Sequence, residues 1–295
     1  MPNLPAGVIE VTEAELPAVR AYLEARVETS LFLLSNLRAF GHRQGDSPYS
    51  GDFRALVASG DIQAVWCLTR SGHVVVQGDG RADQAPIIEA DTVGRGTEVR
   101  GVLGDWPMAE ALWTLVRARH DLVVTQHSRE VLYRLALGPA HGADAGAVSG
   151  VRSLTASDAA AWDPLAAAFL QEQRLPVGTS AVRRAGFTKS AENGHWWGAW
   201  DGDRLVSIAS FNAFYHPAAQ VGGVYTVPER RRQGLSRAVM RTLLRDAVTV
   251  HRLTRVILFT GEQAHPARAL YESLGFETCG AFGLYFGERR DEGGR

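Results

Sequence analysis

Residues 224–236 read Val-Tyr-Thr-Val-Pro-Glu-Arg-Arg-Arg-Gln-Gly-Leu-Ser, and this stretch decides the fold around it. The apolar run 221–227 has the length and the β-branched content of a buried strand. Pro228 ends that strand, because proline cannot donate to a sheet ladder. A helix follows, whose apolar face repeats at helical spacing through Leu235, Ala238, Val239, Thr242 and Leu243. The stretch therefore predicts a strand, a basic turn that contains a glycine, and a helix.

A strand, a glycine turn and a helix together suit the binding of a phosphate. The first N–H groups of a helix have no partner within it, and the helix dipole places partial positive charge there. Gly234 lacks a Cβ, so an anion can approach the backbone closely. A Walker A loop needs a Gly-Lys pair and a Rossmann fingerprint needs three glycines, and this stretch has neither. The alternative is an ordinary strand-to-helix turn with a solvated run of arginines.

A second motif lies downstream at residues 267–276, Ala-Arg-Ala-Leu-Tyr-Glu-Ser-Leu-Gly-Phe, after a strand-like run at 255–260. It predicts a helix that ends at Gly275, where a C-cap needs positive φ. Arg231-x-x-Gly234-x-Ser236 resembles the Arg/Gln-x-x-Gly-x-Gly/Ala motif of the GNAT acyltransferase superfamily. Residues 267–276 resemble the family's Ala-x-x-Leu-Tyr-x-x-x-Gly-Phe motif. The resemblance covers about residues 151–288. It departs from the family at Ser236 and at Ala264, where many relatives carry Asn.

This resemblance implies a mixed, mostly antiparallel sheet flanked by helices, with acetyl-CoA as the co-substrate. In the family, the loop holds the pyrophosphate of coenzyme A and the strand before it pairs with the pantetheine arm. The cofactor-binding residues that it implies are Tyr225, Thr226, Val227, Arg231, Arg232, Gln233, Gly234, Leu235, Ser236 and Arg237. Tyr271 matches the family tyrosine that protonates the leaving thiolate, and the alternative is that its ring only fills the core.

The general base is less well defined than the cofactor loop. The strand before the loop carries no acid, so the candidate bases are Glu172, near the end of the first helical region, and Glu262, past the fifth strand. His216 and His265 are further candidates, and the simpler interpretation of each of the four is a solvated surface residue. A water relay could also take the proton. The nine histidines have no ligand spacing, so no metal site is expected.

The chain repeats one plan twice. A short strand and a capping box open each half, at Thr12 and at Thr155, and a hairpin follows in each. We predict an α/β (α+β) fold of two tandem GNAT-like domains, at residues 1–138 and 151–295, joined by a Gly- and Ala-rich linker at 139–150. The first half lacks the glycine loop, and Asp105 lies near a helix start that a phosphate would otherwise occupy. It is therefore expected to be a degenerate copy, which either contributes to the acceptor site or only stabilises the second half.

Composition limits the classes of function that the chain can have. An apolar fraction of 45% and a charged fraction of 21% are those of a globular protein, and a net charge of −1 gives no field that would recruit nucleic acid. Two cysteines cannot form a disulfide framework, and the amino terminus has no signal-peptide pattern. No apolar run approaches the roughly 20 residues of a membrane span. We expect a cytoplasmic monomer or homodimer that does not bind membranes.

The sequence thus predicts an acyl-CoA-dependent N-acyltransferase that moves acetyl from acetyl-CoA to a primary amine on a small molecule or peptide. The alternative is a catalytically silent protein that keeps the CoA fold for binding or regulation, which the replacement at Ala264 and the undefined base leave open. Acyl transfer to an oxygen or a thiol on the same scaffold is a third possibility. The sequence does not name the acceptor.

Overall fold

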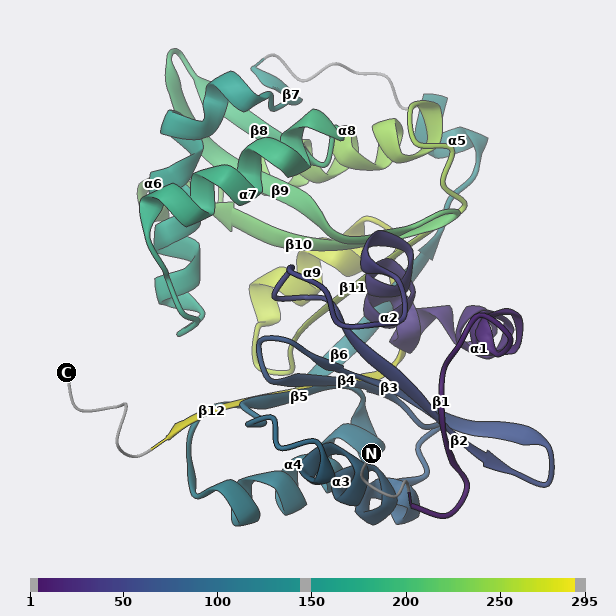
Figure 1. Cartoon of the computed structure of the whole chain (residues 1–295). Coiled ribbons are helices and arrows are strands. Elements are labelled where there is room, and N and C mark those ends of the chain that lie inside the picture. Colours follow the sequence, from purple (N-terminus) through teal and green to yellow (C-terminus); the bar gives the residue numbers. More distant parts are fainter. Residues whose placement is uncertain (1–4, 144–149, 290–295) are drawn as a thin grey trace. The chain divides into compact units, whose positions relative to one another are not determined.

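The chain forms two compact units in a computed structural model that describes residues 5–143 and 150–289. Within these ranges, unit 1 comprises Met1–Leu132, Phe259–Gln263 and Cys279–Arg295, and unit 2 comprises Tyr133–Leu258 and Ala264–Thr278. Each unit is a sheet with helices on both faces (Figure 1).

The helices and strands alternate along the chain, as expected for a tandem α/β arrangement. Unit 1 contains β1 (Val8–Glu10), α1 (Leu16–Glu24), α2 (Val27–Phe40), β2 (Gly51–Ala58), β3 (Asp61–Thr69), β4 (His73–Gln77), the 3₁₀ turn η1 (Ala82–Gln84), α3 (Ala85–Gly94), β5 (Gly101–Asp105) and α4 (Trp106–His120). Unit 2 contains α5 (Pro139–Ala143), β7 (Val151–Ser153), the 3₁₀ turn η2 (Ala156–Asp158), α6 (Ala159–Glu172), α7 (Ser180–Glu192), β8 (Trp196–Asp201), β9 (Arg204–Tyr215), β10 (Ala218–Thr226), the 3₁₀ turn η3 (Pro228–Arg230), α8 (Leu235–Thr249) and α9 (His265–Ser273). The strands β6 (Leu122–Ala136), β11 (Arg255–Gly261) and β12 (Glu277–Arg289) each contribute residues to both units.

The two sheets share one pattern of strand pairing. Unit 1 has the order β1-β2-β3-β4-β5-β12, and unit 2 has the order β7-β8-β9-β10-β11. In each, three antiparallel pairings are followed by one parallel pairing, β4 with β5 and β10 with β11. The predicted fold class, two tandem copies with mixed and mostly antiparallel sheets, is confirmed.

The compact units do not coincide with the predicted halves 1–138 and 151–295. Strand β12, at the end of the sequence, pairs antiparallel with β5 through residues 282–286, so it completes the sheet of unit 1. Part of β6 conversely belongs to unit 2. This exchange could not be predicted from the sequence, because a strand's periodicity does not identify its partner. Of the predicted linker 139–150, the first residues form α5, residues 144–149 lie outside the described ranges, and Gly150 is described as a turn.

Alternation along β8 fixes the layers of unit 2. Trp196 lies with its ring centroid 5.1 Å from that of Trp162 in α6, and Trp162 stacks at 4.5 Å on Phe187 of α7. The next residue, Trp197, points to the opposite face and donates from its indole N–H to Asp246 of α8 at 2.8 Å. Helices α6 and α7 therefore cover one face of the sheet and α8 covers the other (Figure 1).

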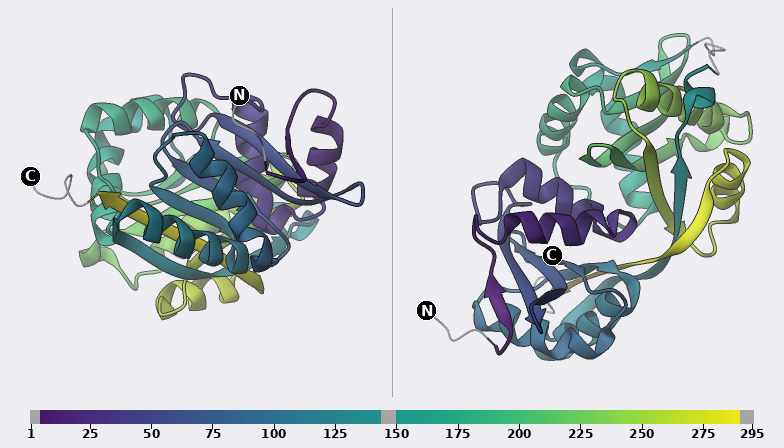
Figure 2. Two further views of the ribbon diagram at one scale, coloured as in Figure 1. Left: turned by 60° about the horizontal axis from the view of Figure 1, so that its bottom comes forward. Right: turned by 90° about the vertical axis from the view of Figure 1, so that its right-hand side faces the viewer.

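The sheet of unit 1 is likewise covered on both faces (Figure 2). On one face, α3 and α4 pack on the strands in a fully buried cluster that includes Trp66, Val74, Val76, Ile88, Met108, Leu112 and Trp113. On the other face, the Gln77 side-chain oxygen at the end of β4 accepts hydrogen bonds from Thr29 and Ser30 of α2. The phenolic O–H of Tyr22 in α1 donates to the Gln63 carbonyl at 2.9 Å.

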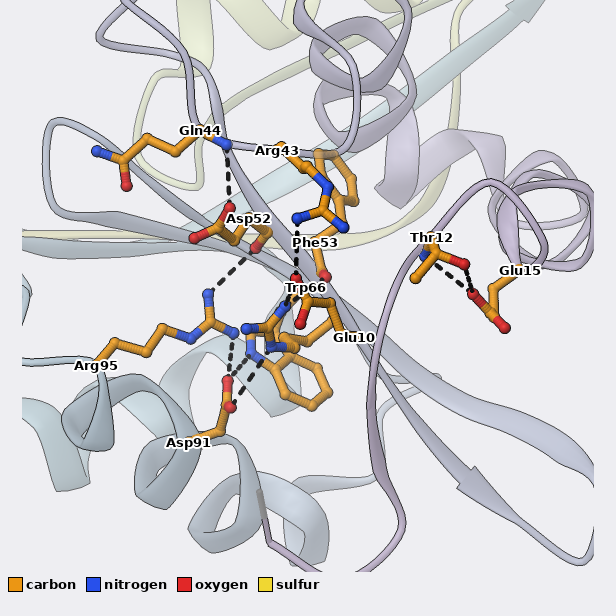
Figure 3. Close-up of polar contacts among 11 residues, drawn as sticks. Glu10, Thr12, Glu15, Arg43, Gln44, Asp52, Phe53, Trp66, Asp91 and Arg95 are labelled. Atoms are coloured by element: carbon orange, nitrogen blue, oxygen red, sulfur yellow. Dashed lines mark hydrogen bonds and ion pairs between the residues drawn. The ribbon is translucent and has the colours of Figure 1, made fainter. Parts of the chain in front are cut away.

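A buried charge network attaches α3 to strands β2 and β3 (Figure 3). The Asp91 carboxylate is 3% exposed and accepts from the indole N–H of Trp66 at 3.0 Å. It also pairs with Arg95 and lies 3.8 Å from the Nε of Arg54. Both guanidinium groups are nearly buried, at 11% and 12% exposed. One carboxylate thus pairs with two cations that water reaches poorly. Its loss takes this counter-charge from Arg95 and leaves Arg54 paired with Glu10, 3.5 Å away.

Replacing Asp91 should therefore destabilise unit 1 strongly. Asp91→Asn keeps the shape and can still accept from Trp66, but it removes the negative charge between two buried arginines. Breaking a buried pair costs about 3–5 kcal/mol. Chemical denaturation measures the change in the free energy of unfolding. The matched control is Asp83→Asn, whose pair with Arg81 is 50% and 70% exposed, and a loss below about 1 kcal/mol is expected there. Equal losses in the two variants would refute the buried-charge interpretation.

Candidate functional site

The loop after β10 has the predicted strand, turn and helix order. The 3₁₀ turn η3 follows the strand, and α8 begins at Leu235. Arg232 and Gly234 have φ values of 61° and 79°, both in the left-handed region that favours glycine. A Cβ built on Gly234 would meet no atom within 4 Å in the described part of the chain. The space in front of the glycine is therefore open to a ligand.

The N-terminus of α8 has no internal group to satisfy it. Within the described residues, no side chain donates or accepts a cap hydrogen bond at Gly234, and the first turn carries no acid. Its first N–H groups therefore face the open side of the loop without a partner in the helix. With the helix dipole, this end of α8 favours an anion, and phosphate oxygens are the acceptors that such helix starts bind.

Three hydroxyl groups fix this end of α8 to the sheet. Ser236 and Thr226 are joined at 2.7 Å, and Thr226 and Ser207 are joined at 2.7 Å. Ser207, which is fully buried, donates to the Tyr225 carbonyl at 3.0 Å. Ser236, where the family motif has Gly or Ala, is thus hydrogen-bonded to β10, and its hydroxyl helps to hold the start of the helix against the strand.

Arg231 is fixed at the end of β10 by three contacts. Its Nε donates to the Thr226 carbonyl at 3.0 Å, and its guanidinium carbon lies 5.5 Å from the centre of the Tyr225 ring. Its Nη2 is 2.6 Å from a carboxylate oxygen of Glu172, the last residue of α6. The structure therefore brings a predicted cofactor residue and a predicted catalytic residue together as an ion pair. The carboxylate pairing raises the pKa of Arg231 further above its already high value.

The parallel pairing of strands β10 and β11 ends before the loop. Their parallel pairing covers only residues 218–220 with residues 255–257. Strand β10 then continues to Thr226 without β11 as its partner in that pairing. Backbone groups on this side of β10 are thus available to a ligand between Val221 and Thr226.

The sequence analysis missed a bulge in β10. The register with β9 shifts between Gly222, opposite Ser210, and Tyr225, opposite Ile208. Gly223 adopts a φ of 61° in this bulge. The signal was present as two adjacent glycines inside an apolar strand, which commonly marks a bulge. A bulge turns backbone groups out of the ladder and so adds unpaired N–H or C=O groups near the site.

Tyr271 lies on α9 with its ring buried, 6% exposed, between two other aromatic rings. The ring centroids of Tyr133 and Phe276 are 6.2 Å and 6.1 Å away. Burial, with a smaller contribution from Tyr133, raises the pKa of Tyr271 well above its ordinary value. The phenol therefore stays protonated at neutral pH. Gly275, with φ of 89°, ends the helix in the left-handed conformation predicted from the sequence.

The other candidate bases belong to other elements of the chain. Glu262 belongs to unit 1, where its carboxylate is 3.5 Å from Arg129. His265 is the first residue of α9, directly after Ala264. His216 lies in the β9–β10 hairpin, and its Nε2 is 3.2 Å from the Arg252 carbonyl. Because β10 rises about 3.3 Å per residue, this hairpin lies on the order of 25 Å from the loop at the strand's other end.

The corresponding region of unit 1 is built differently. Strands β4 and β5 stay paired over residues 73–76 with 101–104, and β4 ends at Gln77, so these strands do not separate. The following loop also has two left-handed residues, Asp79 and Gly80, at 53° and 70°. Asp79 is engaged by Arg26 through two hydrogen bonds of 2.6 Å. Unit 1 thus has a carboxylate and a fully paired set of strands at the position where the strand pairing of unit 2 has ended.

The structure corrects the predicted contact of Asp105. This residue precedes α4, but its carboxylate makes no cap hydrogen bond to that helix. It accepts instead from the backbone N–H of Gly80, in the loop after β4. Helix α4 follows β5 as α9 follows β11, so α4 corresponds to the tyrosine helix and not to the cofactor helix. Burial, the largest effect, raises the pKa of Asp105, and the Gly80 hydrogen bond opposes that shift.

A cavity of about 380 Å³ opens in unit 2 beside the end of β10. Small and apolar residues of α6, Tyr225 of β10 and Val227 just after that strand line it, together with residues 203–205 at the start of β9. The aromatic residues of β8 and β9 point into both layers of the core, as the packing of Trp196 and Trp197 illustrates.

Two classes of feature are absent from the described part of the chain. Residues 5–143 and 150–289 bring together no group of three or more His, Cys, Asp or Glu that could hold a metal ion. None of the helices in these ranges is both long enough and apolar enough to span a membrane.

Sequence comparisons match the region that carries this site. The family model described as "Acetyltransferase (GNAT) family" matches residues 162–276. An uncharacterized N-acetyltransferase of Bacillus subtilis (strain 168), YsnE, is 30% identical over 92 residues, which cover 30% of this chain and 60% of that protein. The chain thus spans about 60% of the length of this curated relative.

Structure comparisons extend over nearly the whole chain. A Drosophila protein of known structure has a TM-score of 0.67 at 14% identity, covering 95% of this chain and 98% of its own. A tandem GNAT protein from the clavulanic acid biosynthesis pathway has a TM-score of 0.54 at 14% identity, covering 94% and 97%. At such low identities these likenesses show the fold alone, and the second shows that tandem GNAT proteins share it.

Removing the central hydroxyl of the Ser207–Thr226–Ser236 chain should destabilise unit 2. Thr226→Val leaves two hydroxyls without their shared partner, and we expect a loss of about 1–3 kcal/mol in the free energy of unfolding. Ser236→Ala should cost about 1 kcal/mol. Because both variants break the same contact, the double variant should cost less than the sum of the two. Strict additivity in denaturation experiments would contradict the chain.

Proposed function

We propose that the chain is an N-acyltransferase of the GNAT superfamily that uses acetyl-CoA, since the acetyltransferase family model matches residues 162–276. The acetyl group would pass to a primary amine on a small molecule or a peptide. The observation that carries this proposal is the uncapped N-terminus of α8 behind the open, left-handed Gly234. A helix start of this kind favours a phosphate group over a neutral ligand.

The residues of this region fit coenzyme A as the co-substrate. The backbone N–H groups at the start of α8 would hold its pyrophosphate, with positive charge from the loop arginines. The proposed cofactor-binding residues are Tyr225, Thr226, Val227, Arg231, Arg232, Gln233, Gly234, Leu235, Ser236 and Arg237. The unpaired stretch of β10 after Gln220 offers backbone groups to the pantetheine amides. The thioester supplies the activated acyl group.

The proposed reaction forms one C–N bond and breaks one C–S bond. The neutral amine attacks the thioester carbonyl, and backbone N–H groups near the bulge in β10 stabilise the developing negative charge on its oxygen. The sulfur leaves with the C–S electron pair, and Tyr271 gives it a proton. The amine nitrogen loses a proton to a base. The Tyr271 phenol carries the proton at neutral pH, and burial, which raises its pKa, makes it a weaker acid than an exposed phenol.

The base that takes the proton from the amine is the next group to assign. Glu172 is paired with Arg231 and Glu262 with Arg129, so neither carboxylate is free of an arginine. Glu262 and a water relay are the proposed routes for the proton, while the position of Glu172 at the loop favours an electrostatic role. The second candidate function is a silent CoA-binding protein. Ala264, in place of the family's Asn, favours that alternative because it removes one polar contact.

We further propose that unit 1 binds no coenzyme A. The continuous pairing of β4 with β5 leaves no space between these strands for a pantetheine arm. The carboxylate of Asp105 takes the Gly80 N–H that a phosphate would use, and the residue before that glycine, Asp79, is already paired with Arg26. Both features oppose an incoming anion.

Substitution of Gly234 tests the cofactor site. Gly234→Glu puts bulk and a negative charge into the open space, and we expect CoA affinity to fall about 100-fold or more, since like charges at short range repel strongly. Gly234→Ala is the matched control. Its Cβ meets open space, and its left-handed backbone costs about 1–2 kcal/mol of stability without adding charge. Calorimetric titration with CoA measures both variants. Wild-type affinity in Gly234→Glu would exclude this loop as the phosphate site.

Substitution of Tyr271 tests the chemistry. Tyr271→Phe keeps the buried ring and removes the acidic proton, so kcat should fall about 10²–10⁴-fold while the affinity for acetyl-CoA changes little. Release of free CoA thiol, followed with a panel of amines at saturating acetyl-CoA, measures kcat. A variant with wild-type kcat, under conditions in which chemistry limits the rate, would assign Tyr271 to the core. Thiol release by no amine in wild-type protein that binds CoA would favour the silent alternative.

A further inference from the structure

The ion pair between Arg231 and Glu172 occupies the position at which a loop arginine would meet a phosphate. Arg231 is held from behind by the Thr226 carbonyl and by the Tyr225 ring. Its outward nitrogen, Nη2, is bonded to Glu172 at 2.6 Å. The two side chains are 41% and 47% exposed, so the pair lies at the surface where a ligand from solvent can reach it.

A carboxylate and a phosphate compete for the same guanidinium nitrogen. The oxygens of the planar carboxylate and of the tetrahedral phosphate both accept hydrogen bonds from a guanidinium group. One N–H group cannot make a strong hydrogen bond to both at once. Glu172 also carries a negative charge that would remain close to any phosphate bound by Arg231. An exposed pair contributes little to stability, so a ligand with several phosphate charges can displace it.

We propose that Glu172 is an internal competitor for the phosphate groups of coenzyme A, and that Arg231 exchanges Glu172 for phosphate when the co-substrate binds. The proposal rests on the proposed function, because coenzyme A supplies the phosphate. Glu172 sets how tightly the site holds its co-substrate: with the carboxylate present, part of the binding free energy is spent in breaking the ion pair.

The exchange has a consequence for helix α6. Glu172 is the last residue of that helix, and residues 173–179 connect it to α7. Arg183 of α7 holds this connection through the carbonyls of Val177 and Gly178, both at 3.0 Å. Release of Glu172 removes the contact of the opposite end with the loop and leaves that end held by the backbone hydrogen bonds of residues 173–175 to α6. Binding of the co-substrate would thereby loosen the segment that contains Arg174.

The neighbouring arginine provides a matched control. Arg230 is also paired with an acid, Asp201, and it is 31% exposed. It lies in η3, before the left-handed residues, and it donates from Nε to Gln233 at 2.9 Å. Asp201→Asn therefore removes one carboxylate from the same loop without freeing Arg231.

Calorimetric titration of the full chain with CoA, and separately with inorganic pyrophosphate, tests the proposal. Glu172→Gln should bind both ligands about 5–20-fold more tightly at low salt, because it removes a competitor and a like charge. The gain should shrink at high salt, where surface charges are screened. Asp201→Asn should stay within about 2-fold of wild type. Unchanged or weaker CoA binding by Glu172→Gln would overturn the proposal, since a pair that only braces the loop predicts weaker binding.

Limited trypsin digestion gives a second readout. Loss of an ordinary surface ion pair would not change the rate of cleavage in this segment. Cleavage after Arg174 should accelerate when CoA is added to wild type, and it should already be fast in free Glu172→Gln. Equal cleavage rates in all three samples would overturn the release of α6. The titrations distinguish failure of the Glu172 proposal from failure of the proposed CoA site. If wild type binds CoA and Glu172→Gln does not differ, only the competitor is rejected. If wild type binds neither ligand, the CoA site itself is rejected as well.

Discussion

The short parallel pairing of β10 with β11 is the constraint on which the candidate site depends. The pairing stops at Gln220 and Ile257, although β10 continues to Thr226. Beyond that point the backbone of β10 is free on one side, and the bulge at Gly223 turns it further out of the ladder. The strand then delivers the loop and the uncapped start of α8 at the same end of the sheet. Longer pairing would close the backbone groups that a ligand needs.

Unit 1 illustrates that outcome within the same chain. Its strands follow the same pattern of pairing, yet β4 and β5 remain joined to within one residue of the end of β4. Asp105 then satisfies the Gly80 N–H, and Arg26 neutralises Asp79. Each polar group that could attract a phosphate has an internal partner. The duplicated architecture thus offers one open and one closed version of a single strand-loop-helix arrangement, and the difference lies in hydrogen bonding and charge.

Negative side chains offset part of the positive charge at the site in unit 2. The helix start and the left-handed loop favour an anion, but Arg230 and Arg231 are each already paired with a carboxylate. The backbone therefore provides a part of the attraction that these two ion pairs do not offset. Tyr271 is buried, and the raised pKa of its phenol keeps it uncharged at neutral pH. This division agrees with a site that holds a charged co-substrate and must also release it.

The sequence by itself determined the local elements of this protein. The strand before Pro228, the helix from Leu235 and the left-handed Gly275 follow from periodicity, from proline's missing N–H and from glycine's freedom at positive φ, all of which act within a few residues. Only the tertiary structure decided that β12 completes the sheet of unit 1, that Ser236 bonds to Thr226, and that Glu172 meets Arg231. Those partners are 10 to 180 or so residues apart, and a pattern in the chain specifies which residues are buried or charged but not which of them come into contact.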